Sequence, residues 1–276
     1  MYSYKLAKAN NGVTYGYFPT LKNKGLTHAI STRLGGISKA PYNTLNLGFN
    51  TDDDSENILK NRQLFLGALN LNINKTVTAQ QIHQNNVFVI EKEETIKSAD
   101  IYENAIEEAD ALITNLKGVP LALFFADCVP VLLYDPVKQI IGISHAGWKG
   151  TLLNITQKTV LKMQERFGSR PADILAAIAP SIGPCCYEVD NNLFEEFKNS
   201  SYNKQSLDLL SKLFTPKKDK FLLNLQEANK MDLIIAGISP ANIYISNICT
   251  ACTNHNYFSH RKDKGITGRF SAVVCL

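Results

Sequence analysis

The segment LALFFADCVPVLLYDPVKQIIGISHAGWKG, residues 121–150, decides the fold. Its apolar run from Leu121 to Tyr134 predicts one long buried strand or a pair of strands bent near Pro130, because proline cannot donate to the hydrogen-bond ladder of a sheet. A further strand is expected over residues 139–144. The small residues of HAGWKG then turn the chain into a helix over residues 151–167, whose apolar positions recur at spacings of three and four.

On both sides of this segment, strands and helices alternate irregularly. The helices are expected over residues 54–69, with Asp53 or Asp54 as N-cap, residues 190–197, capped by Asp190, and residues 225–236. The strands are expected at residues 87–90, 174–179, 242–248 and the C-terminal FSAVVCL. Several strands are neighbours in sequence, which favours an α+β or mixed-sheet α/β fold over a doubly wound Rossmann sheet.

The chain of 276 residues contains no repeat, low-complexity tract or Pro/Gly/Ser linker, so we expect one domain over residues 1–276. The polar stretch at residues 199–206 is interpreted as a surface loop between helices. The net charge of +4 is mild and no dense basic run occurs, which argues against a nucleic-acid partner.

The longest apolar stretch, Val119–Tyr134, is interrupted by Asp127 and two prolines and is shorter than the roughly 20 residues that span a bilayer. No membrane association is therefore expected. The N-terminal MYSYKLAKAN lacks the apolar region of a signal peptide, so we expect a cytoplasmic protein with six reduced cysteines.

Two cysteine spacings stand out. Cys185 and Cys186 are adjacent, and Cys249 and Cys252 form a C-x-x-C. A structural zinc ribbon would need a second C-x-x-C, which the sequence lacks, and the surrounding pattern is not that of a redox pair at a helix start. The sequence therefore favours core thiols for Cys185 and Cys186 and assigns no role to the C-x-x-C.

A metal site is predicted from His83, Cys128 and His145. The chain has only five histidines, and two of them flank a cysteine that lies in the buried strand region. His83 precedes a predicted strand and His145 ends one, and strand ends are where sites are usually built. Two histidines and a cysteine give zinc three protein ligands and leave one tetrahedral position open, as in catalytic sites. The alternative is a core cysteine with two unrelated histidines.

Asp127 stands beside Cys128 in the same apolar run, where an unpaired carboxylate would be costly. It is interpreted either as a buried cap to a backbone N–H or as a catalytic proton shuttle. Because neighbouring residues of a strand point to opposite faces, Asp127 can share a pocket with Cys128 only if the strand bends there.

Several long motifs in one order resemble the laccase-domain family, also called the multicopper polyphenol oxidase-like or peptidoglycan editing factor family. They are STRLGGIS, YNTLNLG, QQIHQNNV, ADCVPVLLYDP, HAGWKG, APSIGPCCYEV and SHRKDKGITGRFSAVV, spread from about Thr27 to Val274. The resemblance implies one α/β domain with a central β-sandwich and outer helices. It also implies zinc at His83, Cys128 and His145.

The same resemblance implies action on purine nucleosides: phosphorolysis of adenosine, inosine, guanosine and methylthioadenosine, and deamination of adenosine. A multicopper site is not expected, because a trinuclear cluster needs about eight histidines beyond the His₂Cys set. Zinc suits deamination, since it lowers the pKa of bound water to about 7 for attack on C6 of adenine.

Phosphorolysis needs a positive group for phosphate. Arg33, in a glycine-punctuated loop, is the first candidate because a guanidinium binds phosphate bidentately, and Arg261, Arg269 and Lys149 are weaker candidates. Two other functions remain open. Cys128 with a histidine could form the nucleophilic dyad of a cysteine hydrolase acting on amide bonds, or the chain could edit cell-wall material without nucleoside chemistry.

Overall fold

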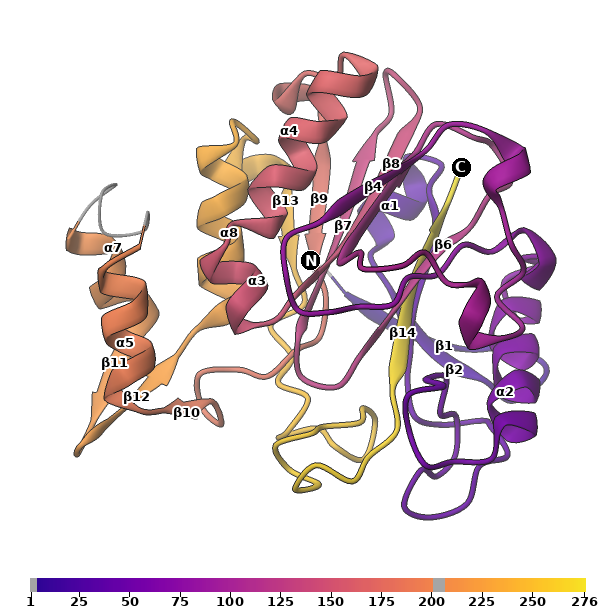
Figure 1. The fold of residues 1–276 in the computed structure, drawn as a ribbon, viewed down its shortest axis with the longest axis horizontal. Coiled ribbons are helices and arrows are strands. Elements are labelled where there is room, and N and C mark those ends of the chain that lie inside the picture. The colour runs from indigo at the N-terminus through magenta and orange to yellow at the C-terminus, as the bar shows by residue number, and fades with distance from the viewer. Residues whose placement is uncertain (1–3, 201–206) are drawn as a thin grey trace.

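Two β-sheets packed face to face form the centre of the molecule, and helices cover both outer faces (Figure 1). The computed structural model describes residues 4–200 and 207–276. The five-stranded sheet has the order β1 (Lys5–Lys8), β2 (Thr14–Tyr17), β3 (Thr27–Ser31), β14 (Phe270–Cys275), β6 (Leu121–Phe125). The six-stranded sheet has the order β13 (Ile243–Ile245), β9 (Leu175–Ile178), β7 (Val129–Asp135), β8 (Ile140–Ala146), β5 (Ala111–Thr114), β4 (Val87–Ile90).

Strand β7 explains why the central apolar run shows no alternation. Leu132 and Tyr134 pack into the core between the two sheets, whereas Val131 and Leu133 pack under helices on the opposite face. A strand buried on both faces has no polar side, so its sequence is continuously apolar. Its neighbours β8 and β9 are antiparallel to it, whereas β4 pairs with β5 in parallel, so the sheet is mixed.

The helices lie in two outer layers. The six-stranded sheet is covered by α3 (Trp148–Leu152), α4 (Ile155–Phe167) and α8 (Leu225–Ile235), and the five-stranded sheet by α2 (Ser55–Gly67) (Figure 1). A short α1 (Pro19–Asn23) joins β2 to β3. This arrangement confirms the mixed α/β fold with a central sandwich and outer helices.

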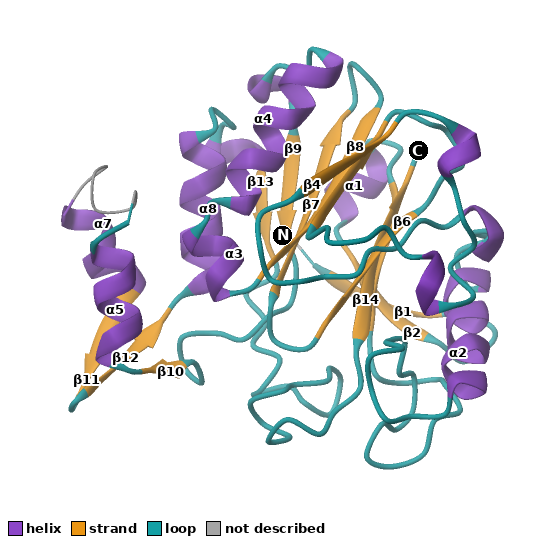
Figure 2. Cartoon of the chain, viewed as in Figure 1, coloured by secondary structure: helices purple, strands orange, loops and turns teal. Residues whose placement is uncertain are grey.

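A smaller lobe projects from the six-stranded side (Figure 2). It contains the sheet β10 (Glu188–Val189), β12 (Lys220–Leu223), β11 (Phe214–Lys217) and the helices α5 (Asn191–Lys198) and α7 (Leu207–Leu213). The Asp190 side chain accepts from Leu193 N, as its predicted capping role requires. Of the predicted surface loop, residues 201–206 lie outside the described residues.

Two details differ from the sequence-based prediction. The apolar run breaks into β6 and β7 at Asp127, which has a φ of 87°, and not at Pro130, which lies inside β7. The helix expected over residues 151–167 is two helices, α3 and α4, because Asn154 between them has a left-handed φ of 59°. Both breaks use Asn or Asp, the non-glycine residues that tolerate this region best.

Long loops gather at one end of both sheets (Figure 2). Residues 32–54 and 246–269 lie side by side there, joined by hydrogen bonds from Arg33 N to Asn256 O and from Leu47 N to Arg269 O. The chain break at Asp127 lies at the same end. Within the two described ranges, no helix has the length and apolar character needed to cross a membrane.

Candidate active site

His83, Cys128 and His145 come together from three separate segments. One ligand atom of each residue lies within 4.8 Å of the other two, and the two imidazole rings are 4.8 Å apart between centroids. His145 ends β8, Cys128 directly precedes β7, and His83 lies in the loop before β4 with a left-handed φ of 58°. The three residues predicted as ligands therefore form one compact donor set that could hold a metal ion.

Asp110 orients two of these three residues. Its fully buried carboxylate accepts hydrogen bonds from the backbone N–H groups of His83 at 3.0 Å and Gln84 at 2.8 Å, and it lies 2.9 Å from Nδ1 of His145. A carboxylate on Nδ1 leaves Nε2 of His145 as the ligand atom and fixes the ring orientation, as in many metal sites. Sequence reasoning missed Asp110, although it carries the signal used for Asp127: a carboxylate beside a buried strand.

Gly147 allows the donor atoms to approach each other. A Cβ at this position would lie 3.0 Å from Sγ of Cys128 and 3.3 Å from Cδ2 of His83. Any side chain here would therefore press against two of the three donors, which explains the small residues of HAGWKG.

In the metal-free protein, Cys128 and His145 form a charged pair. Burial by itself raises the pKa of Cys128, but the charge and hydrogen bonds of His145 and then His83 lower it to about 6 from 9.0. Burial likewise lowers the pKa of His145, but Cys128 and Asp110 raise it to about 9. Cys128 is therefore a thiolate at neutral pH, which is the form that binds metal, and His145 must release a proton to become a ligand.

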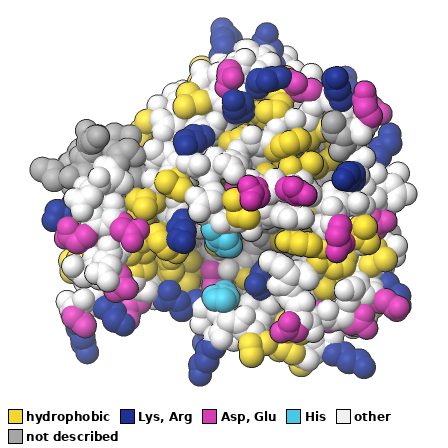
Figure 3. Space-filling model, in the orientation of Figure 1, with side chains coloured by type: hydrophobic (Ala, Val, Ile, Leu, Met, Phe, Trp, Pro, Cys, Tyr) yellow, Lys and Arg dark blue, Asp and Glu magenta, His cyan; other side chains and the backbone are white. Residues whose placement is uncertain are grey.

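The donor set lines a cavity of about 420 Å³. Aromatic side chains form part of the wall, and they are Phe49, Tyr102, Phe124, Trp148 and Tyr187. Three arginines, Arg62, Arg261 and Arg269, supply the positive charge. Figure 3 shows histidine side chains at the hollow in the middle of this face, in agreement with the exposure of His83 and His260, which both line the cavity.

Arg62 is a cavity residue that the sequence did not reveal. It lies in α2, and its guanidinium is 4.2 Å from the ring centroids of both Phe49 and Phe124. It donates to the carbonyls of Leu47 and Ala99. Burial lowers the pKa of Arg62 to about 9, against the opposing charge of Asp100, so the group stays cationic at neutral pH. A charged residue in the middle of a helical pattern gave no signal that it would be buried.

Arg33 and Lys149, both predicted to bind phosphate or substrate, do not line this cavity. The guanidinium of Arg33 donates to the backbone carbonyls of Asn43 and Asn254 and stacks on Phe258 at 4.5 Å. Arg33 therefore joins two loops outside this cavity, and its predicted role in phosphate binding stays a prediction. Lys149 is exposed, with its ammonium over Trp148.

Asp127, Arg261 and Arg269 do line the cavity. The carboxylate of Asp127 accepts from Oγ1 of Thr250 at 2.6 Å and from the backbone N–H of Arg261 at 2.7 Å. The strand ends at the left-handed Asp127, and both Asp127 and Cys128 line the cavity. The hydrogen bonds of the Asp127 carboxylate also match the alternative interpretation, in which this residue is a buried cap to a backbone N–H. Arg269 donates to the carbonyls of residues 267 and 268.

Fold and site together define a class: a helix-flanked double sheet with a His₂Cys donor set in the wall of a large cavity. The chain belongs to the family described as multi-copper polyphenol oxidoreductase laccase, whose model matches residues 27–276. This membership confirms the resemblance found in the motifs.

Similar proteins are named for two activities. The purine nucleoside phosphorylase YlmD of Bacillus subtilis is 36% identical over 252 residues, 91% of this chain and 89% of that protein. The adenosine deaminase RL5, from an unknown prokaryotic organism, is 33% identical and covers 85% of this chain and 88% of its own. The crystal structure of the hypothetical protein YfiH of Bacillus licheniformis has a TM-score of 0.89 and 35% identity, over 98% of this chain and 97% of that chain.

Replacing Asp110 by asparagine tests its orienting role. Asparagine keeps the size of the side chain but loses the charge and one acceptor, so we expect the affinity for a divalent metal ion to fall by about 10- to 100-fold, measured by competition with a chromophoric chelator. Asp135→Asn is the matched control, because Asp135 is also a fully buried carboxylate that accepts backbone N–H bonds, yet it lies outside the cavity. Equal affinities for wild type and the Asp110 variant would contradict the assignment.

The low pKa of Cys128 predicts its reactivity. In metal-free protein, the alkylation rate of Cys128 by iodoacetamide should rise with pH and reach half its maximum near pH 6, because only the thiolate reacts. Peptide mass spectrometry follows each cysteine separately, and Cys275, whose pKa burial raises, serves as the internal reference. Added zinc should protect Cys128. A midpoint near the ordinary 9.0 would show that the charged pair does not form.

Proposed function

We propose that this protein is a zinc-dependent purine nucleoside phosphorylase that also deaminates adenosine. One observation carries the proposal: the His83, Cys128 and His145 donor atoms, within 4.8 Å of one another, form the wall of a cavity that also holds aromatic rings and three arginines. Aromatic faces suit a purine base, and guanidinium groups suit phosphate. The similar proteins named as phosphorylase and deaminase support the same substrate class.

The donor set fits zinc better than a copper cluster. Two imidazoles and a thiolate leave a fourth tetrahedral position free, which is the catalytic zinc pattern. Among the described residues, only His83 and His145 of the five histidines join this group. His28 is buried in β3 and accepts from Phe18 N. Histidines for a trinuclear copper centre are therefore lacking.

When bound at His83, Cys128 and His145, zinc would supply Lewis-acid chemistry and lower the pKa of a water molecule to about 7. Deamination replaces the amino group at C6 of adenine by oxygen and releases ammonia, so a proton must pass from water to the leaving nitrogen. The Asp127 carboxylate lines the same cavity and is our candidate for that proton transfer. It also accepts a hydrogen bond from the backbone N–H of Arg261.

Phosphorolysis uses the cationic side of the cavity. A phosphate oxygen bonds to C1′ of the ribose as the bond from C1′ to N9 breaks, and the base leaves with the electron pair and takes up a proton. We assign phosphate binding to Arg62, with Arg261 and Arg269 as further contacts. Within the described part of the chain, Arg62 donates to two backbone carbonyls, and a guanidinium carries five N–H donors, so donors remain for a ligand.

Product analysis separates this function from its alternatives. Wild-type protein incubated with adenosine should release adenine only when phosphate is present, and should form inosine with or without it. Cys128→Ala should lose both products and the zinc of the His83, Cys128 and His145 set, whereas Cys275→Ala, a cysteine in β14 outside the cavity, should keep both products and that ion. Activity of the metal-free protein on amides would instead support the cysteine hydrolase. Absence of both nucleoside products from zinc-loaded protein would support a cell-wall role without nucleoside chemistry.

Arg62→Lys tests the phosphate assignment. Lysine keeps the charge but cannot reproduce the planar fork, so a bidentate contact typically worth about 2–3 kcal/mol is lost. We expect release of free base to fall by about 30- to 150-fold, while conversion of adenosine to inosine falls much less.

Arg33→Lys is the matched control for this variant. Arg33 also stacks on an aromatic ring and donates to backbone carbonyls, but outside the cavity, so both reactions should persist. Chromatography of adenine and inosine measures both rates. An equal fall of the two products in Arg62→Lys would show that Arg62 binds the nucleoside or supports the fold and does not bind phosphate.

A further inference from the structure

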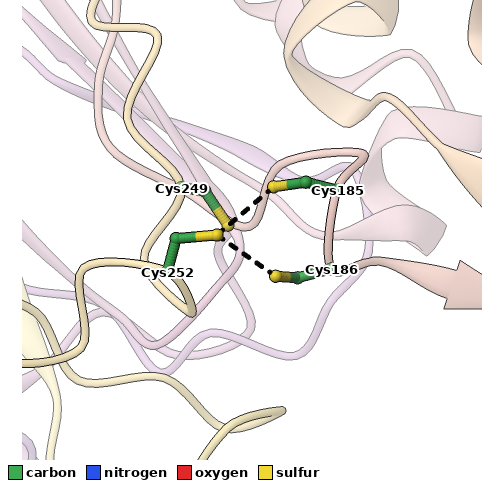
Figure 4. A group of neighbouring side chains, drawn as sticks. All are labelled: Cys185, Cys186, Cys249 and Cys252. Carbon is green, nitrogen blue, oxygen red and sulfur yellow. Dashed lines mark hydrogen bonds between the residues drawn. The ribbon is translucent and has the colours of Figure 1, made fainter.

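Four cysteines from two loops meet at one point of the molecule (Figure 4). Cys185 and Cys186 follow β9, and Cys249 and Cys252 follow β13. The four Sγ atoms all lie within 4.8 Å of one another. The sequence analysis found no partner for the C-x-x-C because it looked for a second C-x-x-C. The structure corrects this, since the adjacent pair, expected to be core thiols, is the partner.

The distances between the sulfur atoms fit one tetrahedral ion. Four thiolates at about 2.3 Å from zinc would be separated by about 3.8 Å along the edges of a tetrahedron. The Sγ atom of Cys252 is 3.5 Å from that of Cys185 and 3.4 Å from that of Cys186. A disulfide would need about 2.05 Å between two sulfurs, and all four cysteines are free. An iron–sulfur cluster would hold its cysteines farther apart, because bridging sulfides lie between the metal ions.

The two loops are shaped for this approach. A Cβ at Gly183 would lie 3.1 Å from Cβ of Cys249 and 3.4 Å from Sγ of Cys185, so only glycine leaves the space free. The backbone N–H of Gly183 donates to Sγ of Cys249 at 3.2 Å. Donors directed at a sulfur stabilise a thiolate, which is the metal-binding form.

Hydrogen bonds outside the cluster hold both loops in place before any ion binds. Thr250 N donates to Ser181 O at 3.0 Å, which joins the loops directly, and Thr253 N donates to Cys249 O at 3.0 Å. The Gln226 side chain of α8 donates to Ser181 Oγ and to the carbonyl of residue 248. The four sulfurs therefore need little further ordering, and the exposure of Cys185 and Cys252 gives an ion a path of entry.

We propose that Cys185, Cys186, Cys249 and Cys252 form a second metal site, which binds one zinc ion through four thiolates and is structural. Four protein ligands leave no open position, so this ion has no place for a substrate. Its binding displaces the thiol protons. The site is separate from the His₂Cys set and does not depend on the proposed nucleoside chemistry.

The position of the site indicates what the ion stabilises. Tyr187 follows Cys186 directly in sequence. Its ring lies 5.0 Å from the guanidinium of Arg261, which follows Cys252 on the other loop. Both residues line the cavity. The loop from β13 also supplies Thr250, which donates to the carboxylate of Asp127. An ion that joins the two loops therefore fixes one wall of the active-site cavity.

Zinc stoichiometry tests the proposal. Wild-type protein, produced with zinc and purified under reducing conditions, should contain about two zinc ions per chain by elemental analysis. Cys249→Ser with Cys252→Ser should lose one ion and unfold at a lower temperature, while Cys275→Ser, in β14, should keep both. Cys128→Ala should also lose one ion, but from the other site, so a failure of the proposed function is distinguished from a failure of this inference.

Two measurements cover the case in which the double serine variant does not fold. Cys128→Ala reconstituted with cobalt should show the visible bands of a tetrahedral ion and strong thiolate charge-transfer absorption. Intact mass under non-reducing, denaturing conditions should show all four thiols. A zinc content unchanged by the double substitution would overturn the proposal. So would cobalt spectra without those bands, or a mass lowered by two hydrogens for each disulfide.

Discussion

The buried carboxylate of Asp110 is the constraint on which the site depends. A charge with no exposed surface must be compensated locally, and Asp110 is compensated by backbone N–H groups of residues 83 and 84 and by the ring of His145. These contacts fix a loop backbone and a strand-end side chain to the start of β5. Two of the three candidate ligands are therefore placed by one carboxylate, and the third, Cys128, approaches because Gly147 has no side chain.

The double sheet brings the remaining parts to the same end of the molecule. Both sheets are buried on their facing sides, and their connections at one end form the cavity wall. The break at Asp127 turns the chain from one sheet into the other, because β6 belongs to the five-stranded sheet and β7 to the six-stranded sheet. Asp127, where the chain passes from one sheet to the other, is therefore the sequence neighbour of the candidate ligand Cys128. The same strand break thus shapes the fold and positions the site.

Arginines show where sequence reasoning reached its limit. Arg33 and Arg62 each stack on aromatic rings and donate to backbone carbonyls, but only Arg62 lines the cavity. The sequence made Arg33, in a glycine-punctuated loop, the first candidate because a guanidinium binds phosphate bidentately, and it did not suggest Arg62. Arg62 lies in a helix, and whether a helical arginine faces solvent or a cavity depends on what packs against it. The same limit applied to Asp110 and to the pairing of Cys185 and Cys186 with the C-x-x-C.

By itself, the sequence determined the mixed α/β class, the buried strands β6 to β9, the longer helices, the family and the three candidate ligands. The family follows from the resemblance of several long motifs in one order. The other features follow from local patterns: apolar periodicity, capping residues, and donor types at strand ends. Tertiary structure alone decided which carboxylate orients the histidines, which arginine enters the cavity and which cysteines meet. Those outcomes depend on distances between segments far apart in the chain, as with Cys186 and Cys252, and no local pattern encodes such distances.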